Sequence, residues 1–171
     1  MNQILIGKKL LIVDDEPDIL DTLGEFLDMC AVEKATDFES ARHLLLNNLY
    51  DAVILDIMGV SGYELLALAK ARKIPALMLT AHALSPDHLE KSIAGGACCY
   101  LPKDEIIHIA EHLCDVLLAE KENRFSAHVW FDKLGPYFEK KWGAQWTFDR
   151  KASLRSLSLA HTTDELTQVL K

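Results

Sequence analysis

Short, nearly continuous apolar runs alternate along this chain with longer segments of helical periodicity. Strands that are covered by helices on both faces are apolar throughout, whereas half-exposed strands alternate between apolar and polar residues. The alternation therefore predicts an α/β fold in which parallel strands are joined by helices. Five strands are expected, the second of them the weakest, at Leu10–Val13, Ala31–Ala35, Ala52–Leu55, Ala76–Leu79 and Cys98–Leu101.

Local signals place several helix starts. Thr36 and Glu39 form a capping-box pattern, and Ser85 followed by Pro86 is typical of a helix cap with a first-turn proline. Residues 104–134 contain neither Gly nor Pro and carry an apolar stripe of helical period. We expect the fifth helix to start in this segment and to lose its apolar character at residues 120–124, where we place a domain boundary.

The residues beyond this boundary differ in composition. Residues 1–121 hold 10 basic and 20 acidic residues, while residues 122–171 hold 8 basic and 6 acidic ones, together with eight of the thirteen aromatic residues. A chain of 171 residues has room for one ordinary domain and a small appendage. We therefore expect a C-terminal extension that is mostly helical. Gly135-Pro136 should break any helix there, and Thr162 with Glu165 suggests a short final helix.

Charge and hydropathy exclude several classes of function. The net charge of −8 provides no basic footprint for nucleic acid, and the extension, with a balance of +2, is too short for a helix-turn-helix module. The N-terminus lacks the order of a signal peptide, and no apolar stretch approaches the length of a membrane span. The four cysteines show neither zinc-finger nor disulfide-framework spacing. We expect a cytoplasmic protein that neither enters a membrane nor binds DNA directly.

Polar side chains follow four of the predicted strands. Asp14 and Asp15 follow the first strand, Asp56 the third and Thr80 the fourth, and Lys103 comes two residues after the last. In an open parallel sheet, ligands bind at the carboxyl ends of the strands. The five side chains should therefore meet at one rim of the sheet.

Three carboxylates at one rim need a cation. Two carboxylates about 4 Å apart repel by roughly 4 kcal/mol at an effective dielectric constant near 20. Mg²⁺ is suited to such a site because it binds through a few carboxylates and completes its shell with water and phosphate oxygens. With the metal bound, one carboxylate can attack a phosphorus atom, Lys103 can neutralise a phosphoryl oxygen, and Thr80 can donate a hydrogen bond.

The segment resembles the receiver domain of two-component response regulators. The resemblance is carried by four motifs in order: LLIVDDEP at 10–17, VILD at 53–56, MLTA at 78–81 and GACCYLPK at 96–103. It implies a flavodoxin-like, doubly wound five-stranded sheet in the order 2-1-3-4-5 over residues 1–121. Residues 122–171 form the aromatic-rich extension to this receiver domain.

The resemblance also implies the roles of individual residues. Asp56 would accept a phosphoryl group from a histidine kinase. Asp14, Asp15, Asp56 and the backbone carbonyl of Met58 would hold Mg²⁺. Thr80 and Lys103 would contact the phosphoryl oxygens, and Tyr100 matches the family's switch aromatic, whose ring turns inward when the threonine is drawn to the phosphate.

Three departures from the family pattern affect these expectations. The glycine after the phosphoacceptor comes two residues early, at Gly62, so the loop that carries Met58 should be shortened. Lys103 is followed by Asp104 where the family usually has proline, so we expect no cis bond there. The span from Thr80 to Lys103 is slightly long and contains Pro86, so the fourth helix should start late.

Taken together, the residues predict a phosphorylation-dependent switch rather than a metabolic enzyme. Its partners would be a sensor histidine kinase or phosphotransfer protein and an unknown downstream protein. The extension would either pack back as helices or present a docking or homodimerisation surface. Two alternatives remain: a phosphatase with an aspartyl nucleophile, which needs a second aspartate where this chain has Met58, and a receiver-like scaffold that is not phosphorylated.

Overall fold

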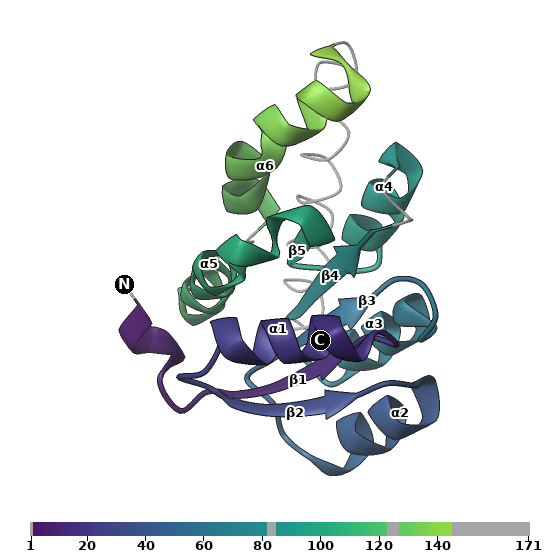
Figure 1. Ribbon diagram of the computed structural model, residues 1–171, viewed down its shortest axis with the longest axis vertical. Helices are drawn as coiled ribbons and strands as arrows, with labels where there is room; N and C mark the ends of the chain where they lie inside the picture. The colour runs from purple at the N-terminus through teal and green to yellow at the C-terminus, as the bar shows by residue number, and fades with distance from the viewer. Residues whose placement is uncertain (1, 82–84, 123–126, 145–171) are drawn as a thin grey trace, which may run out of the picture.

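The computed structural model describes residues 2–81, 85–122 and 127–144 (Figure 1). Its centre is one sheet of five parallel strands in the order β2-β1-β3-β4-β5. The strands are β1 (Lys9–Val13), β2 (Ala31–Ala35), β3 (Ala52–Asp56), β4 (Ala76–Thr80) and β5 (Cys99–Pro102). The predicted fold class, strand positions and strand order are confirmed, with strand ends within one residue of those expected.

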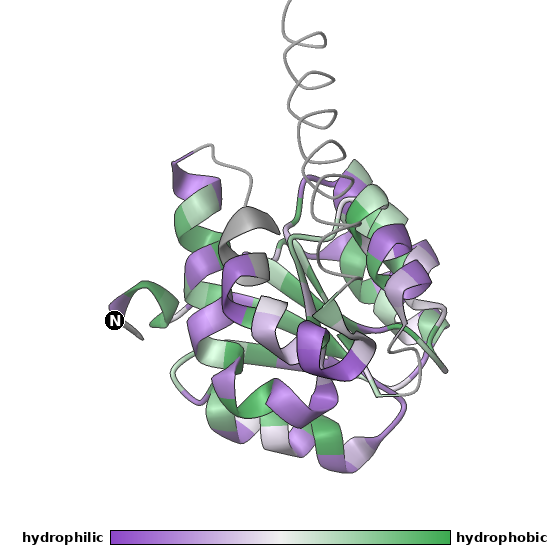
Figure 2. Cartoon of the chain, turned by 90° about the horizontal axis from the view of Figure 1, so that it is seen from above, coloured by the Kyte–Doolittle hydropathy of each residue, from purple (hydrophilic) through white to green (hydrophobic). Residues whose placement is uncertain are grey.

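Helices cover both faces of this sheet. The five that connect or follow the strands are α1 (Pro17–Phe26), α2 (Phe38–Asn47), α3 (Gly62–Ala71), α4 (Pro86–Ala94) and α5 (Ile109–Lys121). Helices α1 and α5 pack against each other on one face, and α2 packs against α3 on the other. Each helix carries a hydrophobic strip and a hydrophilic one (Figure 2), as expected of helices with one face on a core.

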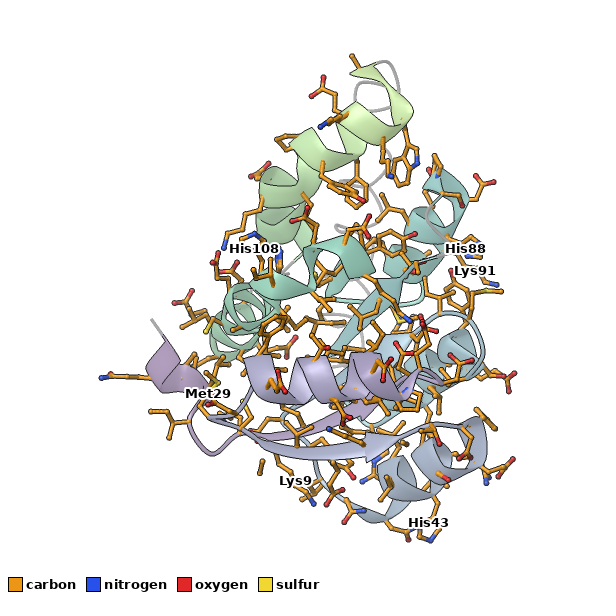
Figure 3. All side chains as sticks on the ribbon, in the orientation of Figure 1. Lys9, Met29, His43, His88, Lys91 and His108 are labelled. Atoms are coloured by element: carbon orange, nitrogen blue, oxygen red, sulfur yellow. The ribbon has the colours of Figure 1, made fainter. Side chains whose placement is uncertain are left out.

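A side-chain link joins α3 to α4. The hydroxyl of Tyr63 lies 2.7 Å from Nδ1 of His88, and the two rings stack with centroids 6.0 Å apart. The ammonium of Lys91, labelled beside His88 in Figure 3, lies 4.1 Å from the centre of the Tyr63 ring. These contacts join α3 to the first two turns of α4, which begins at Pro86.

The three central strands form the core because nothing but apolar residues occupies most of their length. All residues of β3 and β4 are buried, as are Leu10–Val13 of β1. At about 25 cal/mol per Å² of buried apolar surface, these strands are the main source of folding free energy. The polar side chains at their carboxyl ends are therefore held by a rigid scaffold.

One of the two predicted helix caps is confirmed and the other is wrong by one residue. Ser85 accepts a hydrogen bond from the backbone N–H of His88 at 3.2 Å, as expected. The cap of α2 is Asp37, not Thr36, because the Asp37 carboxylate accepts from both the backbone N–H and the hydroxyl of Ser40, each at 2.8 Å. The hydroxyl of Thr36 has only one oxygen, so it could not accept these two hydrogen bonds on separate oxygens as the carboxylate does.

The chain after β5 departs from expectation twice. A 3₁₀-helix, η2 (Lys103–His108), precedes α5, which ends at Lys121 near the expected boundary. The prediction that Gly135-Pro136 breaks any helix is wrong, because α6 (Ala127–Trp142) runs through both residues. Proline removes one backbone hydrogen bond, but Leu134 and Phe138, on either side of it, are buried in the core cluster and hold the helix.

Three smaller features complete the fold. A 3₁₀-helix, η1 (Asn2–Leu5), precedes β1 and contacts α5. No peptide bond in the part of the chain that the structure describes is cis, including the one after Lys103. No described helix is both long enough and apolar enough to span a bilayer. The final helix expected around Thr162 and Glu165 lies outside the described residues.

Candidate functional site

The polar residues predicted to share a rim are placed there by the register of the sheet. Asp14 directly follows β1, Asp56 and Thr80 are the last residues of β3 and β4, and Lys103 directly follows β5. Neighbouring strands bring these ends together, since Asp56 is paired with Leu79 and Thr80 with Pro102. Four strand ends thus contribute one side chain each to the same edge.

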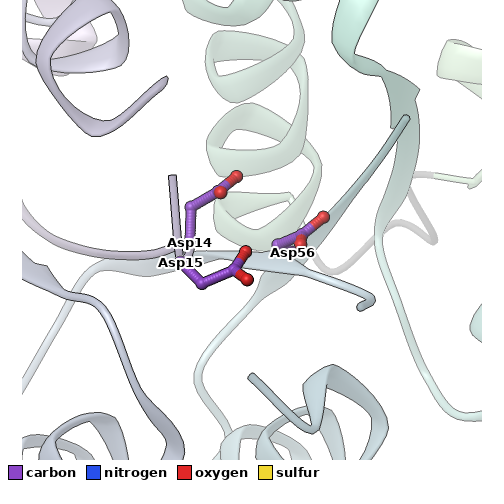
Figure 4. A group of neighbouring side chains, drawn as sticks. All are labelled: Asp14, Asp15 and Asp56. Carbon is purple, nitrogen blue, oxygen red and sulfur yellow. The ribbon is translucent and has the colours of Figure 1, made fainter. Parts of the chain in front are cut away.

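Three carboxylates form the centre of this site. One oxygen from each of Asp14, Asp15 and Asp56 lies within 4.8 Å of the others (Figure 4). Asp14 is fully buried and Asp56 is 4% exposed, whereas Asp15 faces solvent. Carboxylate oxygens at such spacing are the donor set that a hard divalent cation prefers, and the exposed Asp15 leaves the site open to water. The residues therefore fit a magnesium ion.

Lys103 is the positive charge within this acidic group. Its ammonium lies 2.7 Å from Oδ2 of Asp14 and 3.5 Å from Oδ1 of Asp56, with the lysine side chain only 8% exposed. It also lies 2.7 Å from Oε1 of Glu16, the residue that precedes α1. Three carboxylates lie near this ammonium and Asp15 adds a fourth to the site, so the acidic groups outnumber the single cation and favour a further one.

The charges of these groups depend strongly on one another. Burial, followed by the repulsion from Asp14, raises the pKa of Asp56 to about 6. Burial also raises the pKa of Asp14, against the effect of hydrogen bonds from Lys103 and the backbone of Glu16. For Lys103, burial opposes the charged form, but hydrogen bonds to Asp14 and Glu16 prevail and raise its pKa to about 12. Lys103 is thus firmly cationic.

The loop after β3 approaches the carboxylates closely. Gly59 has φ of +80°, and a Cβ at this position would lie 2.4 Å from Oδ2 of Asp15. A Cβ on Gly62 would lie 2.1 Å from the backbone oxygen of Asp56. The two glycines let a short loop turn back over the site, and Met58 sits in that loop with 53% of its side chain exposed. The early glycine noted in the sequence therefore has a steric reason.

Thr80 and Tyr100 form the second part of the site. Thr80 is 1% exposed and Tyr100 is fully buried in β5, the strand next to β4. Burial raises the pKa of Tyr100, and a side-chain hydrogen bond with Thr80 acts in the opposite direction. The buried Tyr100 side chain is therefore linked to Thr80, at a strand end of the site.

Sequence reasoning missed one member of the site, Glu16. It was read only as part of the acidic motif at 10–17, yet its side chain contacts Lys103. The contact spans 87 positions of the chain. Its only signal in the sequence is its place two residues after Asp14, which becomes informative once the sheet order is known.

Comparisons with known proteins agree with this arrangement. The sequence model of the response regulator receiver domain family matches residues 10–113. The two-component response regulator ARR18 of Arabidopsis thaliana is 35% identical over 104 residues, which cover 57% of this chain and 16% of that protein. The uncharacterized transcriptional regulatory protein YrkP of Bacillus subtilis is 39% identical over 92 residues, which cover 52% of this chain and 40% of YrkP. The chain thus spans less than half of these relatives.

Two solved structures match nearly along their whole length. One is a response regulator, described as putative, from Chloroflexus aurantiacus, with 29% identity and a TM-score of 0.59 over 66% of this chain and 98% of that one. The other is a CheY-like receiver domain protein from Methanospirillum hungatei, with 28% identity and a TM-score of 0.56 over 68% and 98%.

Proposed function

The chain belongs to the response regulator receiver family, and from this premise we propose that it is a signalling switch that accepts a phosphoryl group on Asp56. The donor would be a histidine kinase or a phosphotransfer protein. The observation that carries the proposal is the convergence of Asp14, Asp15, Asp56 and Lys103 on one rim, with carboxylate oxygens within 4.8 Å of one another and the ammonium among them.

In this proposal Asp56 acts as the nucleophile. Its backbone is fixed by pairing with β4, and its side chain lies at the edge of the core beside the ammonium of Lys103. Attack of a carboxylate oxygen on phosphorus forms an acyl phosphate as the bond to the donor nitrogen breaks. Lys103 then stabilises negative charge on the transferred oxygens, and the Thr80 hydroxyl donates to one of them.

The proposal includes a metal ion because the site offers several oxygen ligands. Asp14, Asp15 and Asp56 would hold Mg²⁺, with the backbone carbonyl of Met58 as a further ligand. When bound, the ion neutralises the oxygens of the phosphoryl group in transfer. The residues of the chain supply the rest, since burial and the short loop keep Asp56 oriented, and Lys103 compensates the charge of Asp14.

We further propose that the output passes through protein contacts. The weak net charge of residues 122–171, eight basic against six acidic, provides little affinity for DNA phosphates. The downstream protein is unknown, and a second copy of this chain is one candidate. No metabolic reaction is assigned, because the domain would change only its own phosphorylation.

The test uses acetyl phosphate or beryllofluoride with Mg²⁺ on the full chain. With acetyl phosphate we expect a stoichiometric labile phosphoryl adduct, seen by intact mass, and with beryllofluoride stoichiometric binding to the folded protein; Asp56→Asn should abolish both, and Asp18→Asn, an exposed substitution on α1, should leave both unchanged. Continuous turnover of phosphate esters would instead indicate the phosphatase alternative. No adduct at all under these conditions would indicate a scaffold and would refute the proposal.

A further inference from the structure

The last described helix, α6, packs on the edge of the sheet that carries Tyr100. It contacts both β5 and α5 (Figure 1). Phe138 is 0% exposed and Leu134 is 5% exposed, so the middle of α6 is anchored in the core. An ion pair between Lys133 and Asp115 of α5 adds a polar contact beside them.

Phe138 is the residue of α6 that meets Tyr100. The two ring centroids are 6.0 Å apart with an interplanar angle of 44°. Phe138 is held in turn by Trp142, which stacks on it at 4.7 Å and 12°, and by Tyr137, which meets it edge-on at 5.6 Å. Aromatic pairs of these geometries attract beyond the area they bury. Tyr100 thus contacts Phe138 of α6 through its ring, and its hydroxyl shares hydrogen bonds with the backbone of Ser85 and the side chain of Thr80.

The same turn of α6 reaches a second part of the site. The hydroxyl of Tyr137 lies 3.4 Å from Oδ2 of Asp104, the residue that follows Lys103. Two successive residues of α6 therefore touch Tyr100 and the neighbour of Lys103. Both contacts lie on the segment from β5 to η2, which carries the site lysine.

We propose that Phe138 is a positioning residue for the switch: α6, when docked, holds the Tyr100 ring inward against Thr80 and so favours the phosphorylated state of Asp56. The proposal rests on the proposed function. Because Phe138 packs against the Tyr100 ring and both residues are fully buried, outward rotation of Tyr100 requires α6 to move. The extension therefore promotes the switched state rather than blocking it.

Coupling of this kind is reciprocal. If docking of α6 favours the arrangement that binds a phosphoryl group, then binding of a phosphoryl group strengthens the docking of α6 by the same factor. Typical coupling factors lie between about 5 and 150. A single aromatic contact belongs near the lower end, so we expect about tenfold.

The experiment measures the affinity of the full chain for beryllofluoride in the presence of saturating Mg²⁺, and separately for Mg²⁺ alone. We expect Phe138→Ala to weaken beryllofluoride binding about tenfold and to leave the affinity for Mg²⁺ alone unchanged. Phe138→Leu, which keeps apolar bulk, should recover most of the loss. In a Tyr100→Ala background, Phe138→Ala should have no further effect, since the contact acts through Tyr100.

Other outcomes overturn the inference. Equal beryllofluoride affinity in the parent and in Phe138→Ala would mean that α6 has no effect on the switched state. Tighter binding in the variant would mean that α6 opposes that state. Equal losses for beryllofluoride and for Mg²⁺ alone would point to general damage of the site. If the parent itself forms no adduct, the proposed function fails; if the parent forms the adduct and the variants match it, only the role of Phe138 fails.

Discussion

The ammonium of Lys103 lies 2.7 Å from the carboxylate of Asp14, and these two side chains are 8% and 0% exposed. A buried ion pair of this kind contributes little net stability when intact, because both charges have lost their hydration. Removing one partner is costly, however, since the other charge is then buried without compensation. The pair therefore makes the folded state depend on the lysine even before any ligand binds.

We predict that Lys103→Met lowers the free energy of unfolding by about 3 kcal/mol at neutral pH without metal. Urea denaturation in EDTA measures the free energy of unfolding of the variant and the parent. The matched control is Lys34→Met, which removes an ion pair of similar length, 2.8 Å to Asp21, but with 37% and 74% of the side chains exposed. That change should cost less than about 1 kcal/mol. Equal losses for the two variants would contradict the prediction.

Asp56 makes stability depend on pH in the metal-free protein. Its pKa is raised from 3.8 to about 6, so the folded state binds this proton more tightly than the unfolded chain does. The free energy of unfolding therefore falls as the pH rises from about 4 to about 6. Two pKa units correspond to about 3 kcal/mol.

We therefore predict that Asp56→Asn is more stable than the parent by about 3 kcal/mol at pH 7 in EDTA. The difference should shrink as the pH falls below about 6 and vanish below about pH 4, where the aspartic acid is neutral in both states. Urea denaturation of both proteins across this pH range measures the difference in free energy of unfolding. The matched control is Asp18→Asn, which replaces an exposed carboxylate on α1. An asparagine variant less stable than the parent at pH 7 would refute the argument.

The sheet and the rim were predictable from the sequence because both depend on neighbouring residues. An apolar run such as Ala76–Leu79 predicts a buried strand without any other information. The polar residue that follows it, Thr80, marks the end of that strand and so the position of the rim. Once strands are parallel, their carboxyl ends meet at one edge whatever the loops do. For this reason Asp14, Asp56 and Lys103 could be assigned to one site before any distance was known.

The remaining features depend on contacts that are distant in the sequence or on competition between similar residues. Thr36 and Asp37 both suit a helix cap, and only the second oxygen of Asp37, which accepts from the Ser40 hydroxyl, decides between them. Helix α6 continues through Pro136 because tertiary burial of Phe138 outweighs a local preference. The contact of Phe138 with Tyr100 leaves no pattern in the sequence.

Removal of one carboxylate should weaken metal binding without unfolding the protein. Asp15 is the exposed member of the acidic group, so Asp15→Asn removes a ligand and little packing. In the parent, Mg²⁺ at about ten times its dissociation constant should stabilise the fold by about 1.4 kcal/mol. We predict that most of this gain is lost in Asp15→Asn, as measured by urea denaturation with and without Mg²⁺. An undiminished gain would place the ion elsewhere.

Substitution of glycine by alanine should change stability in opposite directions at Gly62 and Gly135. A methyl group on Gly62 would lie 2.1 Å from the backbone oxygen of Asp56, so Gly62→Ala must shift the loop at the site. We expect a loss of about 3 kcal/mol and slower formation of the acetyl phosphate adduct. For Gly135, inside α6, no atom of the described residues lies within 4 Å of an added methyl group. Gly135→Ala leaves the loop at the site in place and should stabilise helix α6 by about 0.5–1 kcal/mol.

Met58 should control how long a phosphoryl group stays on Asp56. It follows Asp56 by two residues in the short loop, and its apolar side chain extends into solvent with 53% exposure. A bulky apolar group at this place hinders the approach of a hydrolytic water, whereas a small amide would admit one and orient it by a hydrogen bond.

We predict that Met58→Asn shortens the lifetime of the acyl phosphate about fivefold, which corresponds to about 1 kcal/mol in activation free energy. The measurement follows loss of the phosphoryl group from purified, phosphorylated protein after removal of acetyl phosphate. Met58→Leu retains apolar bulk and should keep the lifetime of the parent, which separates exclusion of water from any disturbance of the loop. Because the Met58 side chain is half exposed, neither change should alter stability by more than about 0.5 kcal/mol. Equal lifetimes in the asparagine variant and the parent would mean that water reaches the phosphorus by a path that Met58 does not guard.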